Sequence, residues 1–382
     1  MFRSLFFLTY LFLLNSNPLS AQLNNAIFNG SSHPINSSLT QTGTNPMALK
    51  NAPNVWGVQA LHYFKNNEYM EAHNPGQTFF GVQLTTGRTW YLNQNQTKLN
   101  VGAILNVPFG GINQTKVYPL IQFQHAFSNA HQLVLGSLHG NTRHQLYEPL
   151  YNYELALTQP LEYGVQYRYQ QNRFESDLWL DWRQTAQSQI SQQEIISFGW
   201  NARLKLHNEP FKIHQISIPM SSLVYHQGGE SLSVGKPIQN KWNGSVGLRY
   251  DYKNRLRFES IVFGSQDFSP QLQTSFKDGH AWYNQIHFNL NPRHNWVLSH
   301  YYAEEFHAPF GPNLFLSEQL GNPFAFVNYR NFIMARYQWM GVIIPETCIF
   351  DFRIEPIWHI EKQQFAFSAG FYLKYVIGTE LY

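Results

Sequence analysis

Sixteen histidines are the residues of this chain that first suggest chemistry. Metal sites usually place His and Cys ligands at short, fixed spacings, because the ligands must converge on one ion. Pairs such as His139/His144 and His280/His287 show no such spacing and have no cysteine beside them. Cys348 is the one cysteine, so it forms no intramolecular disulfide, and it suits a small apolar position in a strand. We therefore expect no metal and no cofactor.

Hydrolysis by a serine nucleophile would need a histidine beside the serine and an Asn or Asp that orients the ring. The candidate residues are Ser137, Ser197, Ser260, Ser299, His139 and His300. Sequence does not pair them, since their contacts depend on cross-strand register. The chain also lacks a Gly-x-Ser-x-Gly nucleophile motif. We predict that the protein is not an enzyme and keep a barrel-embedded lipid hydrolase as a second alternative.

A set of charged residues alternates with apolar ones along several segments. In 246–252, for example, Val246, Leu248 and Tyr250 alternate with Arg249 and Asp251. Charges that face lipid at mid-bilayer cost about 2–4 kcal/mol for Arg or Lys, so the charged set must face an interior. The candidates for solute contact in that interior are Arg168, Trp179, Asp181, Arg183, Arg203, Lys205, Arg249, Asp251, Arg257 and Arg336. Alternatively, these side chains pair across strands and brace the wall.

The elements that must position this set are strands, because the alternation has period two. Apolar residues Tyr163, Val165, Tyr167 and Tyr169 alternate with polar ones, and the pattern repeats from residue 54 to the C-terminus. Short turns and long loops follow one another, as in outer-membrane barrels. We predict an all-β, closed antiparallel transmembrane barrel of about sixteen strands (14–18), with short periplasmic turns and long extracellular loops.

Composition agrees with a wall between lipid and water. Charged residues make up 13% of the chain and aromatic residues 16%, yet mean hydropathy is −0.36. The formal charge of +3 is too mild and the basic residues too dispersed to indicate a nucleic-acid partner.

Three regions follow from these patterns. We predict a signal peptide at 1–21, an irregular periplasmic or mouth segment at 22–53, and the barrel at 54–382. This predicts export to the cell outer membrane of a Gram-negative bacterium. The expected partners are outer-membrane lipid, the barrel assembly machinery and a surface or periplasmic protein.

Two long loops are too apolar to lie free in water. Residues 140–160 include Tyr147, Leu150 and Tyr151, and residues 304–326 include Phe310 and Leu314–Leu316. We expect one of them to fold into the lumen as a constriction, in preference to docking a partner. By contrast, we predict that 65–76 is a long surface loop, and that a bulge or short tail breaks the register of the last strand.

The signal sequence ending in Ser-Ala-Gln, the Asn/Gln- and aromatic-rich strands and the C-terminal aromatic resemble those of Bacteroidota outer-membrane barrels. Asn45-Pro46-Met47-Ala48-Leu49 loosely resembles a stretch of fatty-acid-transporter-like and PorP/SprF-type barrels. The second of these families implies a role in secretion or gliding.

We therefore predict a porin-like channel or transporter for small hydrophilic solutes, anionic or sugar-like. The first alternative is a non-conducting barrel that serves as a scaffold for secretion or surface machinery.

Overall fold

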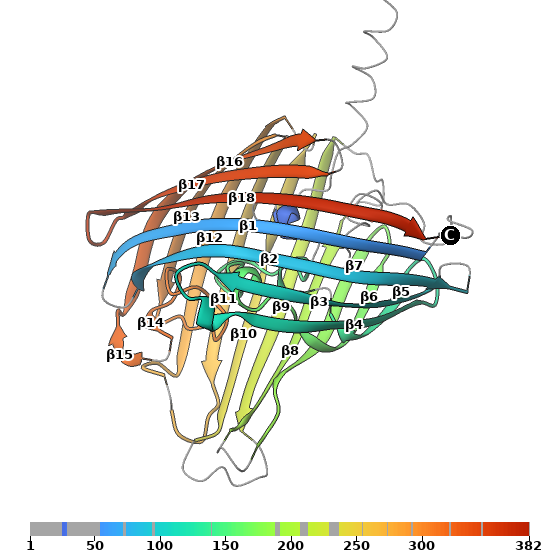
Figure 1. The fold of residues 1–382 in the computed structure, drawn as a ribbon. Helices are drawn as coiled ribbons and strands as arrows, with labels where there is room; N and C mark the ends of the chain where they lie inside the picture. Colours follow the sequence, from blue (N-terminus) through green and yellow to red (C-terminus); the bar gives the residue numbers. More distant parts are fainter. Residues whose placement is uncertain are drawn as a thin grey trace, which may run out of the picture.

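The computed structural model describes residues 25–28, 54–71, 74–93, 96–138, 140–187, 192–206, 213–228, 237–253, 255–272, 274–291, 293–320, 322–344 and 347–381. It shows a closed antiparallel barrel of sixteen strands (Figure 1). The strands are β1 (Asn54–Glu71), β2 (Asn74–Leu92), β3 (Thr97–Pro108), β4 (Lys116–Ala126), β5 (His131–Ser137), β6 (Tyr163–Gln170), β7 (Phe174–Gln184), β8 (Glu194–Lys205), β9 (His214–Gly228), β10 (Gln239–Tyr252), β11 (Leu256–Asp267), β12 (Asp278–Asn291), β13 (His294–Glu304), β16 (Tyr329–Ile344), β17 (Cys348–His359) and β18 (Gln364–Leu381). Each strand pairs with its neighbour in the chain, β13 pairs with β16, and β18 closes the barrel on β1. The predicted fold class is confirmed.

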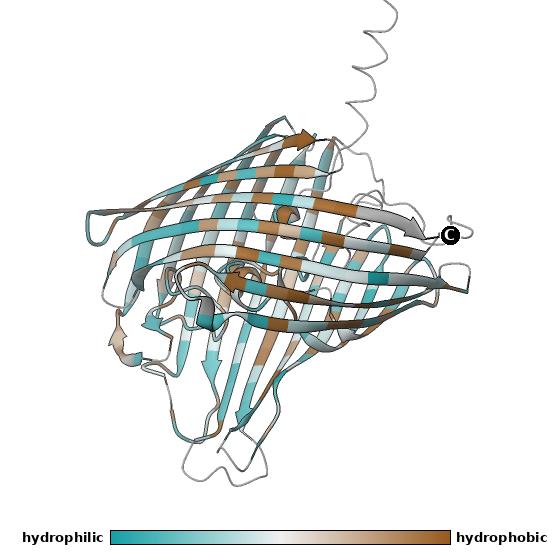
Figure 2. Cartoon of the chain, viewed as in Figure 1, coloured by the Kyte–Doolittle hydropathy of each residue, from teal (hydrophilic) through white to brown (hydrophobic). Residues whose placement is uncertain are grey.

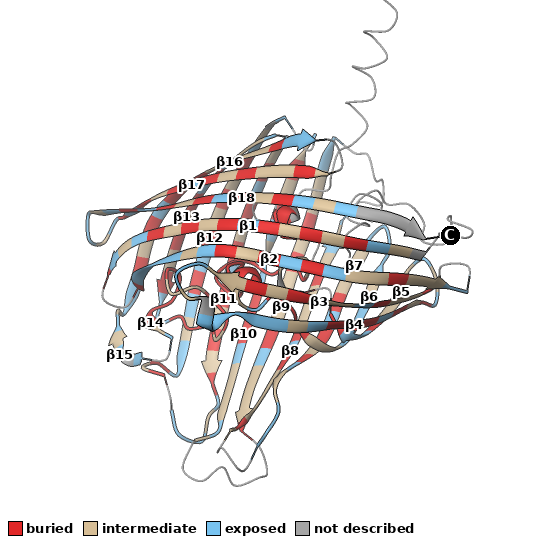
Figure 3. Ribbon diagram, viewed as in Figure 1, coloured by how far each residue is buried: buried red, intermediate tan, exposed pale blue. Residues whose placement is uncertain are grey.

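The two faces of the wall follow the period-two pattern. Hydrophilic and hydrophobic residues alternate along the strands in Figure 2, and buried and exposed residues alternate in Figure 3. On β10, Val246 and Leu248 are exposed, whereas Arg249 and Asp251 are buried. A barrel in a bilayer needs this arrangement, because its outer face contacts lipid and its inner face can hold charge. In the described part of the chain, no helix is long and apolar enough to cross a membrane.

Two predictions about the strands are wrong. The expected loop at 65–76 is a continuation of β1 and β2, whose pairing runs to Glu71↔Asn74 with one irregularity after Asn67. Its polar residues suggested a loop, but Lys65 and Asn67 are buried inside the barrel, where polar side chains are tolerated. β18 pairs with β1 from Glu68↔Phe367 to Asn54↔Leu381 without a bulge.

Both of the long apolar connections enter the barrel, whereas inward folding was expected of one. We call residues 138–162 the first inner segment and residues 305–328 the second inner segment. The first contains η3 (Asn141–Arg143) and α2 (Leu155–Thr158), and the second contains the small hairpin β14 (Glu318–Gln319) and β15 (Asn322–Phe326). η1 (Asn25–Ile27) also lies within the barrel (Figure 1), where Ile27 and Phe28 are buried. The predicted signal peptide and the resemblance at 45–49 lie outside the described residues.

Candidate functional site in the filled barrel

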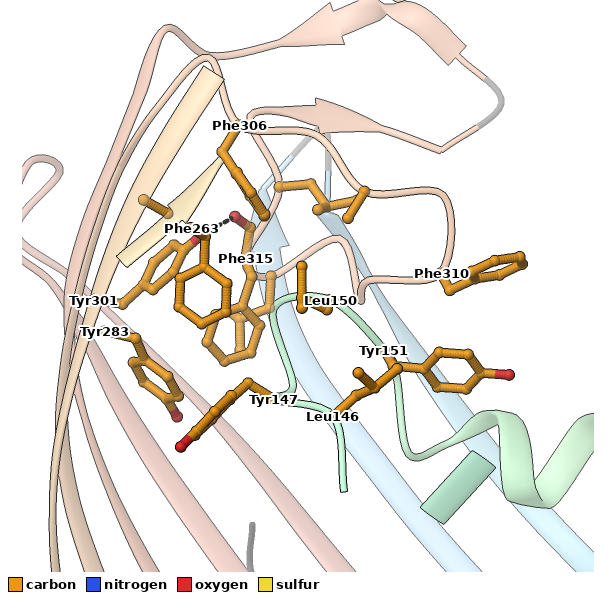
Figure 4. Packing of buried hydrophobic residues seen from close by; sticks show 14 of the residues in the cluster. Leu146, Tyr147, Leu150, Tyr151, Phe263, Tyr283, Tyr301, Phe306, Phe310 and Phe315 are labelled. Atoms are coloured by element: carbon orange, nitrogen blue, oxygen red, sulfur yellow. Dashed lines mark hydrogen bonds between the residues drawn. The ribbon is translucent and has the colours of Figure 1, made fainter. Parts of the chain in front are cut away.

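Aromatic packing joins the two inner segments to each other. The Tyr151 and Phe310 rings lie 5.5 Å apart, and the Asn152 backbone N–H donates to the Phe310 carbonyl at 2.7 Å. Phe315 packs on the Tyr301 ring of β13 at 4.9 Å, and the Tyr301 hydroxyl donates to the Phe315 carbonyl at 2.8 Å. Figure 4 shows these side chains meeting between the inner segments and the wall. The interior near the end from which the inner segments enter is therefore a packed core.

Buried charges also tie the first inner segment to the wall. Arg336 of β16 reaches Glu148 at 2.5 Å and Glu355 of β17 at 3.5 Å. Lys65 of β1 lies 3.0 Å from Glu355 and 3.5 Å from Glu154. Cations of the wall thus alternate with carboxylates of the wall and of the inner segment. Removing one member would leave another charge buried without its partner.

His144 anchors the start of the first inner segment. Its ring lies 2.7 Å from Glu162 and 2.9 Å from Asp177, and it stacks on Trp179 with the ring centroids 3.7 Å apart. Burial opposes a charge on the ring, but the two carboxylates outweigh it and raise the pKa of His144 to about 9. The imidazole is therefore protonated at neutral pH and acts as a cation rather than as a base.

The predicted interior residues all have partners within the protein. Asp251 accepts from Arg249 at 2.6 Å and from Arg257 at 2.8 Å, and Arg203 and Lys205 both pair with Glu175. Beyond these, Arg183 pairs with Asp181, Arg336 with Glu148, Trp179 with His144, and Arg168 with Gln132. Contact of these residues with a solute remains a prediction.

The candidate serines and histidines are not brought together as nucleophile and base in the described residues. Ser299 donates to the Met334 carbonyl, Ser260 accepts from the Trp282 indole, and His300 lies beside Asn331. His139 lies outside the described residues.

A second charged group lies at the end of the barrel from which the inner segments enter. We call it the rim cluster. It comprises Glu71 at the end of β1, Arg330 of β16, His359 at the end of β17, and Glu361 and Lys362 of the β17–β18 turn. Glu71 accepts from Arg330 and from Lys362, each at 2.7 Å. All but Lys362, whose side chain is 33% exposed, are buried.

Sequence reasoning did not identify this cluster as a site. Glu71 fell within the expected loop, and His359 and Glu361 belong to different elements. The sequence offered one signal for the cluster. His359 and Glu361 are two residues apart at the end of a strand, a spacing that places both side chains on the same face. The cluster combines an imidazole and carboxylates, which can activate water, with cations that can hold an anion.

Known structures place this molecule among outer-membrane barrels. It superimposes on the anion-selective porin of Comamonas acidovorans with a TM-score of 0.52 and 7% identity, covering 85% of this chain and 99% of the porin. OccK2 of Pseudomonas aeruginosa gives 0.51 and 7%, covering 86% and 98%. A loop L8 deletion mutant of OmpT of Vibrio cholerae gives 0.51 and 9%, covering 85% and 100%. These likenesses show the porin-like fold.

The family is defined by sequence. The model of the Lipid A 3'-O-deacylase-type family matches residues 55–381, so the chain belongs to that family. No curated protein matches the chain.

The prediction that the protein is not an enzyme is overturned by this match, because the family is of an enzyme type. Contiguous sequence motifs do not reveal a site that is assembled from distant parts of the chain. A closed barrel brings together residues that are far apart in the chain, as it does for Glu71 of β1 and His359 of β17, the strands on either side of β18.

Proposed function

We propose that this protein hydrolyses an acyl ester of a lipid A-like glycolipid in the outer leaflet of the outer membrane. The observation that carries the proposal is the family match, which covers nearly the whole barrel, from Val55 to Leu381. A deacylase does not need a path for solutes through its lumen, because its substrate is a membrane lipid. The packed interior agrees with such a role.

The rim cluster is our candidate site for this reaction. It lies at the end with the long connections, and this end faces the exterior in outer-membrane barrels. Arg330 and Lys362 could hold a phosphate of the lipid through charge-assisted hydrogen bonds. His359 and its two carboxylate neighbours could activate the water that attacks the ester carbonyl, either by accepting its proton or through a bound cation.

The test is mass spectrometry of lipid A after incubation with the purified barrel in detergent. We expect loss of one acyl chain with the wild-type protein and at least about a hundredfold lower rate with His359→Ala, the smallest contribution typical of a general base. The matched control is His280→Ala, because His280 is an exposed histidine at the same end, 3.8 Å from Glu304. No loss of acyl chains with folded wild-type protein would refute the proposal. Equal rates for His359→Ala and wild type would refute only the site.

A channel remains the second candidate function, for small hydrophilic solutes of anionic or sugar-like character. It is favoured by the sixteen-strand wall, since barrels of this size commonly enclose an aqueous lumen. In this case the inner segments would act as a plug that moves aside. Planar-bilayer recordings separate the two candidates. Stable conductance by the wild-type protein would support the channel, whereas silence in wild type and conductance after deletion of residues 308–314 would indicate a permanent plug.

A further inference from the structure

We propose that the outer wall formed by β9, β10 and β11 binds the ester end of an acyl chain of one outer-leaflet lipid, at a site separate from the rim cluster. The structure has a cavity of about 370 Å³ on these three neighbouring strands. This volume is within the range of about 300–1,000 Å³ that is usual for small-molecule sites. The lining residues come from the three strands and from the residue that follows β11, and they are Val224, Asn240, Lys241, Trp242, Gln266 and Phe268.

The cavity lies on the lipid-facing side of the barrel. Val224, Trp242 and Phe268 are all exposed. Trp242 is on the same face of β10 as the exposed residues Val246 and Leu248, because even-numbered residues of this strand point outward. Apolar side chains on this face of an outer-membrane barrel contact lipid. The cavity is therefore continuous with the lipid-facing wall, and a lipid is the occupant that this position favours.

The cavity is near the outer edge of the apolar band of the wall. Trp242 and Tyr250 both face outward on β10 and are eight residues apart, which is about 27 Å along a strand. A strand tilt of about 35–45° reduces this distance to about 20 Å across the membrane, close to the usual band height of about 25 Å. Aromatic residues commonly mark both edges of this band. Trp242 therefore lies near the level at which lipid ester groups meet hydrocarbon.

One wall of the cavity is a tryptophan held in a fixed position. The Trp242 indole N–H donates to Ser222 Oγ at 3.0 Å. The indole also lies against Gly244, since a Cβ added to that glycine would be 2.5 Å from Trp242 Cζ2. Glycine within a strand often marks the close approach of another group, and here the group is the indole. A wall that is already fixed before the ligand arrives lowers the entropic cost of binding.

Amide groups border the extracellular side of the cavity. Asn240 and Gln266 both line it. His226 Nδ1 lies 2.7 Å from Asn240 Oδ1, so the Asn240 oxygen is bound and its amide nitrogen is left as a donor. The Lys241 side chain alternates with Trp242 to the inner face, where its charge interacts with Glu318. The cavity thus offers neutral donors beside an apolar surface, which suits the carbonyl of an acyl ester better than a phosphate.

This site and the rim cluster are on different parts of the wall. β12 and β13 lie between β11 and β16, the nearest strand of the rim cluster. A lipid held beside Trp242 is therefore not the lipid that the rim cluster would hydrolyse. Its binding requires no hydrolysis and does not depend on the proposed function.

The experiment is photolabelling of the full-length barrel in lipid nanodiscs that contain phosphatidylethanolamine with a diazirine near the ester end of one acyl chain. Mass spectrometry of the digested protein then locates the label, and we expect saturable labelling of the peptides that contain Val224 and Phe268. Val224→Phe should fill the cavity and weaken binding at least about tenfold, which corresponds to lost contact for about two methylene groups. Val262→Phe is the matched control, because Val262 is an exposed valine of β11 that does not line the cavity. Trp242→Phe, which removes the bond to Ser222, tests the site if Val224→Phe misfolds.

The outcomes separate a specific site from ordinary contact with bulk lipid. Labelling that is spread evenly over the wall and does not saturate would overturn the site, as would equal binding by folded Val224→Phe and Val262→Phe. Competition by a fatty-acid methyl ester that exceeds competition by hexadecane would support the role of the amides, whereas equal competition would overturn it. Failure of the deacylase assay would leave these results unchanged, because that assay tests the rim cluster.

Discussion

Replacing Arg336 by methionine tests whether buried charges hold the first inner segment in the barrel. Arg336 lies between Glu148 of that segment and Glu355 of the wall, and all three side chains are at most 8% exposed. Breaking a buried ion pair by removing one partner costs about 3–5 kcal/mol. Glu355 keeps Lys65 at 3.0 Å, so the loss falls mainly on Glu148. Burial raises the pKa of Glu148, so proton uptake limits the cost, and we expect about 3 kcal/mol.

The assay is reversible urea unfolding of the barrel in detergent, followed by tryptophan fluorescence. The double variant Arg336→Met/Glu148→Gln should recover most of the lost free energy of unfolding, because neither partner is then a buried, unpaired charge. Arg336→Met should also give open-channel events in planar bilayers more often than wild type, since the segment is less firmly held. A loss below about 0.5 kcal/mol, the range of ordinary surface substitutions, would refute the reasoning. So would a double variant that is no more stable than the single one.

Three further predictions concern the wall, the first inner segment and the cysteine. Arginine in place of lipid-facing Leu248 should cost about 2–4 kcal/mol and lower the refolding yield, whereas Arg168→Gln, which loses one contact with Gln132, should refold like wild type. The pKa of His144 is about 9 when folded and 6.5 ordinarily, so its stabilisation is complete below pH 6.5 and is lost as pH rises through 9. Hydrogen exchange of residues 141–147 should therefore accelerate over that range, beyond the intrinsic increase seen in His144→Asn. Buried Cys348 should resist a bulky maleimide in the folded barrel and react in urea, and rapid labelling of folded protein would contradict its placement.

The wall was predictable because one physical constraint acts along its whole length. Residues that face lipid are mostly apolar, so Leu178, Phe198 and Leu248 mark the outer face without any knowledge of their neighbours. The constraint is weaker inside, where apolar and polar residues are both allowed. For this reason the polar residues Lys65 and Asn67, which face the interior, led to the prediction of a loop. The ends of β1 and β2 were therefore predicted wrongly.

The sequence predicted which residues face the interior of the barrel, but not which of them contact one another. The period-two alternation correctly placed Arg249, Arg257 and Arg336 on the inner face of the wall. Their partners depend on the strand register and on where the inner segments lie. The Glu148–Arg336 pair joins the first inner segment to a strand at the other end of the chain. No local pattern encodes such a pair, and the same holds for Glu71 and His359 in the rim cluster.

The filling of the barrel bears on how its size should be interpreted. Sixteen strands usually leave an aqueous lumen, so strand count alone favours a channel. Here the space is occupied by aromatic residues such as Tyr301 and Phe315 and by buried ion pairs. Removing one member of such a pair lowers the stability of the folded protein. A plug built to move would be expected to use fewer such pairs, because each must be broken when it opens. A permanently filled barrel instead provides a rigid support, and under the proposed function the reaction takes place at the rim, where the partly exposed Lys362 lies beside Glu71 and His359.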